Sequence, residues 1–309
     1  MVSGRAGMRE VWSLPEADVR AGRRALWWSV GPEGELAVLL VHRRYLRRGG
    51  ARGWVGLRPR GPFDGELVTL TAPGKQRTPL NGIRENPGHL ALLPGGRLLL
   101  AGGRCRRGEA DGAWEPNAVV YSAEGKPTGA FCIGDDVPVL VTDRSGGIWT
   151  AYGDEGIYGS HPESRAGLAG WDSDGRVTWR PRGRLPDRPL QGCTAATDGD
   201  RVWLVWYSGT GSGTFLTRIT PSTGEVVSRP GPVHAPDEFA VRGNRAVMAV
   251  RNHNRPSVEL VRAESDGAGW AVTDRRAVRL PGRVVMHCGQ GRDGFLWLRA
   301  GNTFLRTRA

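Results

Sequence analysis

Residues 137–152 read VPVLVTDRSGGIWTAY, which is an apolar stretch, a short turn and a second apolar stretch. The turn, Asp143 to Gly147, is rich in Asp, Ser and Gly, which tolerate the positive φ angles that hairpin turns require. Consecutive apolar positions flank the turn, so both faces of each strand are expected to be buried. The stretch therefore predicts a β-hairpin that packs between two other sheets.

The same pattern of strand, turn and strand occurs six times along the chain. The turns lie at residues 31–34, 94–96, 143–147, 198–200, 242–244 and 292–294. The strand that follows each turn is centred on Leu36, Leu98, Ile148, Val202, Ala246 or Leu296. These centres lie about 52 residues apart on average, and an all-strand repeat of roughly 40–50 residues is typical of β-propellers. The sequence predicts an all-β fold, a six-bladed β-propeller.

One domain over residues 1–309 is expected to contain all six blades. The blades are expected at residues 25–72, 88–134, 136–181, 191–229, 237–281 and 284–309. The last unit supplies only three strands, and a spare strand lies at residues 8–14. We expect this N-terminal strand to close the last blade, because closure removes an exposed sheet edge. Residues 1–7 are expected to be an unstructured extension.

Composition limits the classes of partner. Glycine accounts for 47 of 309 residues, about twice its usual share of roughly 7%, and has no collagen period. Basic residues outnumber acidic residues by 43 to 31, a net charge of +12. Only Lys75 and Lys126 are lysines, and such an arginine excess is typical of GC-rich genomes. The charge is therefore weaker evidence for a nucleic-acid partner than its total suggests.

The four cysteines, at positions 105, 132, 193 and 288, form no C-x-x-C pair. A structural zinc site is therefore not expected. Four cysteines in a chain of this length are also too few for a disulfide framework. The chain shows no apolar leader segment and no apolar run of about 18 residues, so we expect a cytoplasmic protein without a membrane partner. We also expect a monomer.

Two motifs carry a resemblance to a known family. They are LLPGGR at residues 92–97, followed by GRC at 103–105, and GGIWTAYGDEGIYG at 146–159. With Gly167-Leu168 and Trp171-Asp172, they resemble an uncharacterised actinobacterial family of β-propeller-like proteins. More distantly, the turns are similar to those of NHL-repeat, gluconolactonase-like and streptogramin-lyase-like propellers. The resemblance implies the fold and no activity, because the metal motifs of the last two groups are not matched here.

Polar residues gather at the starts of the expected innermost strands, where propellers usually bind ligands. Imidazole and carboxylate groups that converge there could hold a divalent metal or act as acid and base. The candidates for catalysis are His89, His287, Asp237 and Glu238. The candidates for ligand binding at these strand starts are Asp136, Gln191 and His234. Asp154 and Glu155, in the segment at residues 152–159, are further candidates and could bind a cation or an arginine of the next blade. The alternative is that these residues form an ordinary polar channel mouth and cap turns, and that residues 152–159 form a bulged connection.

An arginine-rich segment, residues 43–54, contains two aromatic residues. Arginines pair with phosphate and aromatic rings stack on bases, so Arg43, Arg44, Arg47 and Arg48 are candidates for binding a polyanion such as RNA. The same composition is found in a solvated surface hairpin.

Three functions remain open from the sequence. The first is a non-catalytic scaffold that presents a site for a protein or small-molecule ligand on one face of the ring. The second is a small-molecule hydrolase or lyase at the channel mouth, assisted by a divalent metal or working without one. The third is binding of RNA through the arginine-rich loop. The scaffold is favoured, because propellers often serve as binding platforms and a fold does not dictate its function.

Overall fold

The structure is a computed structural model that describes residues 8–48, 57–84, 87–110, 112–211, 213–285 and 290–309. Within these ranges the chain forms twenty-six strands and three short α-helices, α1 (Glu16–Arg20), α2 (Asp154–Ile157) and α3 (Pro162–Arg165). None of these helices has the length and apolar character that crossing a bilayer requires. The fold is all-β, as the sequence predicts.

Four of the sheets contain four antiparallel strands each. The first consists of β2 (Arg23–Val30), β3 (Leu36–His42), β6 (Phe63–Thr71) and β7 (Gly74–Ile83). The second consists of β8 (His89–Leu92), β9 (Leu98–Ala101), β10 (Ala118–Tyr121) and β11 (Pro127–Phe131). The third consists of β12 (Val139–Thr142), β13 (Ile148–Ala151), β14 (Leu168–Trp171) and β15 (Val177–Trp179). The fourth consists of β20 (Glu238–Arg242), β21 (Arg245–Arg251), β22 (Ser257–Ser265) and β23 (Trp270–Arg279).

An eight-stranded sheet joins the two ends of the chain to its middle. Its order is β1 (Arg9–Ser13), β26 (Thr303–Arg308), β25 (Phe295–Ala300), β24 (Gln290–Arg292), β16 (Pro189–Asp198), β17 (Arg201–Ser208), β18 (Thr214–Thr220) and β19 (Glu225–Pro230). All its pairings are antiparallel except β16 with β24, which is parallel and only two residue pairs long. A two-stranded sheet, β4 (Leu46–Arg48) with β5 (Leu57–Pro59), and short 3₁₀ turns at Arg43–Tyr45 and Pro94–Gly96 complete the elements.

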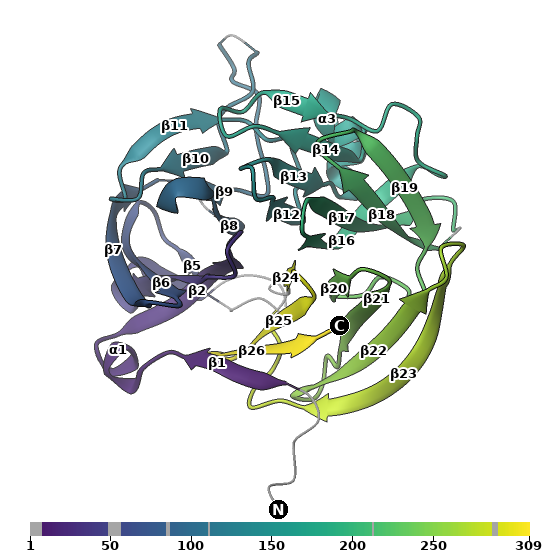
Figure 1. The fold of residues 1–309 in the computed structure, drawn as a ribbon. Coiled ribbons are helices and arrows are strands. Elements are labelled where there is room, and N and C mark those ends of the chain that lie inside the picture. Colours follow the sequence, from purple (N-terminus) through teal and green to yellow (C-terminus); the bar gives the residue numbers. More distant parts are fainter. Residues whose placement is uncertain (1–7, 49–56, 85–86, 111, 212, 286–289) are drawn as a thin grey trace, which may run out of the picture.

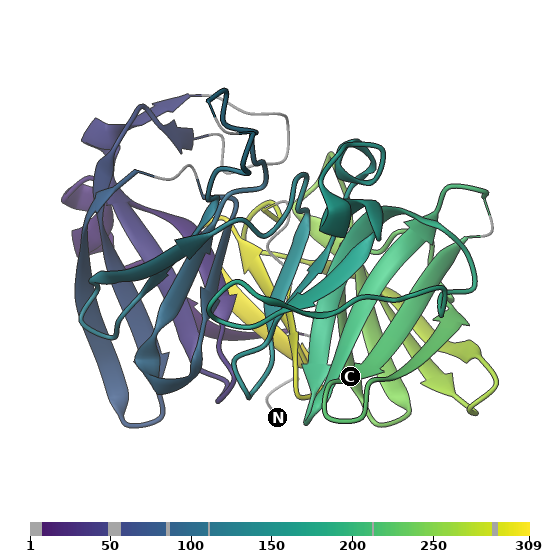
Figure 2. The same cartoon turned by 90° about the horizontal axis from the view of Figure 1, so that it is seen from above.

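The sheets are arranged like the blades of a propeller. Figure 1 shows β2, β8, β12, β16, β20 and β24 around a common centre, with later strands of each sheet farther out. Figure 2 shows the sheets from the side, with short helices among the loops at one end of the strands. The N-terminal strand β1 pairs with β26 in antiparallel register, from Arg9 opposite Arg306 to Ser13 opposite Thr303.

The six turns predicted from the sequence all contain a glycine in the left-handed region. The φ angles of one glycine per turn lie between 59° and 90°, at Gly34, Gly95, Gly146, Gly199, Gly243 and Gly294. A side chain disfavours this region, so the excess of glycine follows from the number of hairpins. The positions of the six predicted turns are therefore confirmed.

Among the described residues, the buried apolar side chains form six clusters, each between two neighbouring groups of strands. Trp149, for example, lies between the third sheet and β16–β19, and Trp203 lies between β16–β19 and the fourth sheet. One cluster joins Trp28 of β2 to Trp297 and Phe304 near the C-terminus. The strands are apolar on both faces because each sheet is covered on both sides.

A buried arginine lies where the innermost strands meet. The Arg292 guanidinium donates to the carbonyl oxygens of Val30 and Thr142 and to the hydroxyl of Thr197, at 2.7–2.8 Å. These acceptors belong to three different sheets. Burial lowers the pKa of Arg292 to about 10, so the side chain stays charged at neutral pH. The hydrogen bonds therefore link strands that are far apart in sequence.

Two segments differ from the sequence-based expectation. The first sheet extends to Ile83 rather than to residue 72. The sequence pattern missed its outer strand β7 because this strand is mostly exposed and lacks the apolar pattern of an inner strand. Residues 154–157 form the helical turn α2 rather than a bulged connection. The carboxylate of Asp136 accepts a hydrogen bond from the Glu155 amide and so holds the start of this turn.

Candidate metal-binding site

Three side chains from separate loops converge at one place on the molecule. Cys105 follows β9, Cys132 follows β11, and His161 precedes α3. The two sulfur atoms and a ring nitrogen all lie within 4.8 Å of one another. The Sγ atom of Cys132 lies 3.4 Å from Nε2 of His161. We call this group of three residues the thiol–histidine cluster.

The backbone that carries Cys132 is held firmly. The buried side chain of Asn117 accepts from the amide of Ile133 at 2.9 Å and donates to the carbonyl of Gly134 at 2.8 Å. Gly134 has a φ of 102°, and a Cβ atom there would lie 2.5 Å from the ring of Tyr152. Only glycine fits this position without strain. The sulfur of Cys132 is therefore placed by a rigid segment.

Cys105 is joined to the same segment through Asp135. Its amide donates to Oδ1 of Asp135 at 3.1 Å, and the amide of Asp135 donates to the hydroxyl of Ser164 at 2.8 Å. Asp135 also forms an ion pair with Arg104 at 2.8 Å. These bonds tie the loops that carry Cys105, Cys132 and α3 to one another.

His161 is buried, with 3% of its surface exposed. Its Nδ1 atom lies 3.3 Å from Oε2 of Glu163 and has no hydrogen-bond partner among the described residues. Arg180 contacts the other carboxylate oxygen of Glu163. The ring of Trp114 packs on the imidazole with a centroid distance of 4.8 Å. A carboxylate behind the imidazole is the usual surrounding of a metal-binding histidine.

The two thiols of the cluster have opposite pKa shifts. The hydrogen bond from the Cys105 thiol and, to a smaller extent, the nearby imidazole of His161 together lower the pKa of Cys132 to about 5. The same hydrogen bond, together with burial, raises the pKa of Cys105. The environment therefore favours the thiolate form on Cys132 and the thiol form on Cys105.

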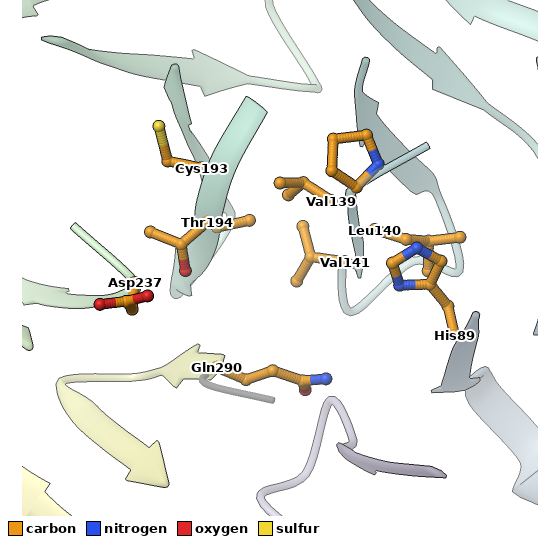
Figure 3. A pocket seen from close by; sticks show the side chains of 10 residues that line it. His89, Val139, Leu140, Val141, Cys193, Thr194, Asp237 and Gln290 are labelled. Carbon is orange, nitrogen blue, oxygen red and sulfur yellow. The ribbon is translucent and has the colours of Figure 1, made fainter. Parts of the chain in front are cut away.

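A second candidate place is a small pocket near the centre of the ring. It is lined by His89, Pro138, Val139, Leu140, Val141, Cys193, Thr194, Ala195, Asp237 and Gln290. Figure 3 shows His89 and Asp237 on opposite sides of it. Its volume of about 30 Å³ has room for one or two water molecules. Thr194 is buried and its hydroxyl has no partner among the described residues, which suits an ordered water.

Of the residues predicted to be catalytic, His89 and Asp237 line this pocket. Nε2 of His89 lies 2.6 Å from the carbonyl oxygen of Val137, and burial lowers its pKa. Asp237 is paired with Arg251 at 2.9 Å. Glu238 is fully buried and does not line the pocket. The predicted residue His287, like Cys288, lies outside the described residues.

The predicted ligand-binding residues divide into two groups. Asp136, Asp154 and Glu155 gather at the start of α2, where the Asp136 carboxylate holds the turn and Glu155 pairs with Arg104. Burial raises the pKa of Asp136. The side-chain amide of Gln191 donates to the carbonyl of Gly192 at 3.3 Å, and the ring of His234 packs on that of Tyr207 with a centroid distance of 5.8 Å. Through Arg104 and Asp135, the first group borders the thiol–histidine cluster.

The predicted polyanion-binding arginines are all exposed. Arg43 and Arg44 belong to a 3₁₀ turn, and Arg44 donates to the hydroxyl of Tyr45 at 2.8 Å. Arg47 and Arg48 belong to β4, where Arg47 lies directly opposite Arg58 of β5. The rest of the loop, residues 49–56, lies outside the described residues.

Glu238 is expected to lower stability as the pH rises. Complete burial raises its pKa well above the usual value of 4.5, so the folded protein keeps a proton that the unfolded chain releases. Stability therefore falls as pH rises from about 4.5 toward the folded pKa, by up to roughly 1.4 kcal/mol per pH unit. We expect Glu238→Gln to raise the denaturation midpoint at pH 7 and to change it little at pH 4. Urea titrations at both pH values measure this, with the exposed Glu115→Gln as control; equal midpoints for wild type and Glu238→Gln at pH 7 would contradict it.

Comparisons with known proteins support the fold alone. No family model matches the chain. No curated protein matches it either. A functionally unknown protein from Desulfotomaculum acetoxidans DSM 771 is similar in structure, with a TM-score of 0.52, 10% identity, and coverage of 90% of this chain and 80% of that one. A luciferin-regenerating enzyme has a TM-score of 0.49 and 11% identity, with coverage of 97% of this chain and 95% of that one. A nidogen/laminin complex has a TM-score of 0.48 and 11% identity, with coverage of 84% of this chain and 81% of that one.

Proposed function

We propose that the chain is a six-bladed β-propeller whose last blade is completed by β1. The eight-stranded sheet then consists of two blades, β16–β19 and β24–β26 with β1, which touch through the short parallel pairing near the axis. The antiparallel register of β1 with β26 supports this assignment. So does the cluster in which Trp28 packs near Trp297 and Phe304, because it joins the first blade to the last.

We further propose that this propeller presents a divalent transition-metal ion, of the Zn²⁺ class, on one face of the ring. The observation that carries the proposal is the convergence of Cys105, Cys132 and His161 within 4.8 Å. With Zn–S and Zn–N distances of about 2.3 and 2.0 Å, tetrahedral ligand atoms are roughly 3.5–3.8 Å apart. The separation of 3.4 Å between Cys132 Sγ and His161 Nε2 is close to that range.

Three protein ligands leave the fourth position of a tetrahedral ion free. Sites of this kind bind water or a ligand atom at that position, whereas structural zinc sites are closed by four protein ligands. The carboxylate of Glu163, held by Arg180, lies behind the imidazole, 3.3 Å from its Nδ1 atom, as outer-shell carboxylates do at metal-binding histidines. The proposed function is therefore that of a binding protein that offers an open metal position to a ligand with a donor atom.

Metal content tests this function. We expect protein purified without chelators to contain about one equivalent of zinc per chain, measured by mass spectrometry of the metal. Replacement by Co²⁺ should produce the absorption band of a cobalt–thiolate bond, because two of the ligands are sulfur. Protein with reduced thiols that holds neither zinc nor cobalt would overturn the proposal.

A further inference from the structure

Three arginines form a row on β1 and β26, the two neighbouring strands at one edge of the eight-stranded sheet. Arg9 of β1 lies directly opposite Arg306 of β26, and Arg308 follows two positions later on the same strand. Residues directly opposite each other, and residues two apart on one strand, project from the same face of a sheet. The Cα atoms of neighbouring members of this arginine row therefore lie roughly 5–7 Å apart.

Within the part of the chain that the structure describes, the arginine row has no acidic partner. The ion pairs of the described residues all involve other side chains. Burial and the positive charges of Arg9 and Arg308 lower the pKa of Arg306. Like charges directly opposite each other in a sheet are destabilising. The fold thus holds three cations together with nothing among the described residues to neutralise them.

Aromatic rings form the floor under the row. The guanidinium of Arg306 lies 4.7 Å from the ring centre of Phe295 and 5.3 Å from that of Trp297. Arg308 lies 5.3 Å from the ring centre of Phe295. Stacking on a ring fixes the plane of a guanidinium and leaves its N–H donors free along the edge. The rings are already covered by these cations, so the site offers charge and hydrogen bonds rather than a stacking surface for bases.

We propose that Arg9, Arg306 and Arg308 bind a ligand with consecutive phosphate groups. Guanidinium groups form bidentate hydrogen bonds with phosphate. A row of three guanidinium groups suits a ligand with several phosphate groups better than a ligand with a single phosphate. The site contacts only the phosphate groups of a ligand. A free polyphosphate and the backbone of a single-stranded nucleic acid both supply such groups. It is separate from the thiol–histidine cluster and does not depend on a bound metal.

The test compares two double variants that each remove two positive charges. Arg9→Gln with Arg308→Gln changes the row, whereas Arg201→Gln with Arg229→Gln changes two exposed arginines of β17 and β19. Binding of tripolyphosphate and of a ten-residue oligouridylate is measured by calorimetry in low salt. We expect the row variant to weaken binding at least tenfold and the control variant less than twofold. For the oligouridylate, the row variant should also weaken the dependence of affinity on salt.

The outcomes separate the sources and the alternatives. Binding of both probes identifies phosphate groups alone as sufficient, and binding of the oligouridylate only identifies a nucleic-acid backbone. Equal weakening in the two double variants would overturn the proposal, because net charge rather than the row would then decide binding. The proposal also fails if wild type binds neither probe, or if only Arg47→Gln with Arg48→Gln weakens binding. Unchanged unfolding midpoints show that the variants are folded.

Discussion

Gly291→Ala is expected to destabilise the protein by about 3 kcal/mol or more, the upper end of the usual cost of overpacking. A Cβ atom at this position would lie 2.2 Å from the carbonyl oxygen of Phe239 and 2.5 Å from Cβ of Ala196. These neighbours belong to β20 and β16, which meet β24 near the axis. They are themselves fixed by their own sheets, so the backbone has little freedom to move away. Denaturant titration followed by tryptophan fluorescence measures the loss.

Gly129→Ala is the matched control. Gly129 lies on the exposed strand β11, and a Cβ atom there would meet nothing within 4 Å. The two variants add the same methyl group, so their difference isolates the close approach at the axis from the general effect of replacing glycine. We expect the control to unfold at the wild-type midpoint or slightly above it. A Gly291→Ala protein within about 0.5 kcal/mol of the control, a difference typical of surface changes, would show that the axis is not tightly packed.

The hairpins could be predicted from the sequence because their signals are local. A turn such as residues 143–147 contains its own glycine and its own capping aspartate, whose carboxylate accepts from the amide of Gly147 at 2.8 Å. The outer strand β7 gave no such signal, since its exposed positions need no apolar pattern. The packing at Gly291 and Arg292 was also beyond prediction. It depends on which strands meet at the axis, and that is a property of the whole ring.

The thiol–histidine cluster was missed for a related reason. Cys105, Cys132 and His161 are separated by 27 and 29 residues, so they show no local motif of the kind that identifies zinc ligands. The signal lies in the strand directions. β9, β11 and β13 all end on the same side of two neighbouring sheets, and the three residues follow those ends. Tracing the direction of each predicted strand would have placed the three residues on the same side of the sheets.

Cys132→Ser is expected to abolish metal retention. The variant removes one of three ligands and replaces a thiolate with a hydroxyl, which binds zinc poorly at neutral pH. We expect the zinc content to fall from about one equivalent to near zero, and the affinity to fall at least about 100-fold, more than outer-shell changes usually cost. Because metal binding stabilises the folded state, a chelator should lower the melting temperature of wild type and leave that of Cys132→Ser unchanged.

Cys193→Ser gives the comparison that makes this result specific. Cys193 is also a half-buried thiol, but it lies at the small central pocket and not in the cluster. Its variant should keep the full metal content, the cobalt–thiolate band and the response to chelator. The metal content of Glu163→Gln should lie between those of Cys132→Ser and Cys193→Ser, since this variant keeps all three ligands and removes only the carboxylate behind His161. Equal metal loss in the Cys132 and Cys193 variants would mean that zinc binds to the thiols of this chain in general, and the open metal position proposed for this propeller would then have no basis.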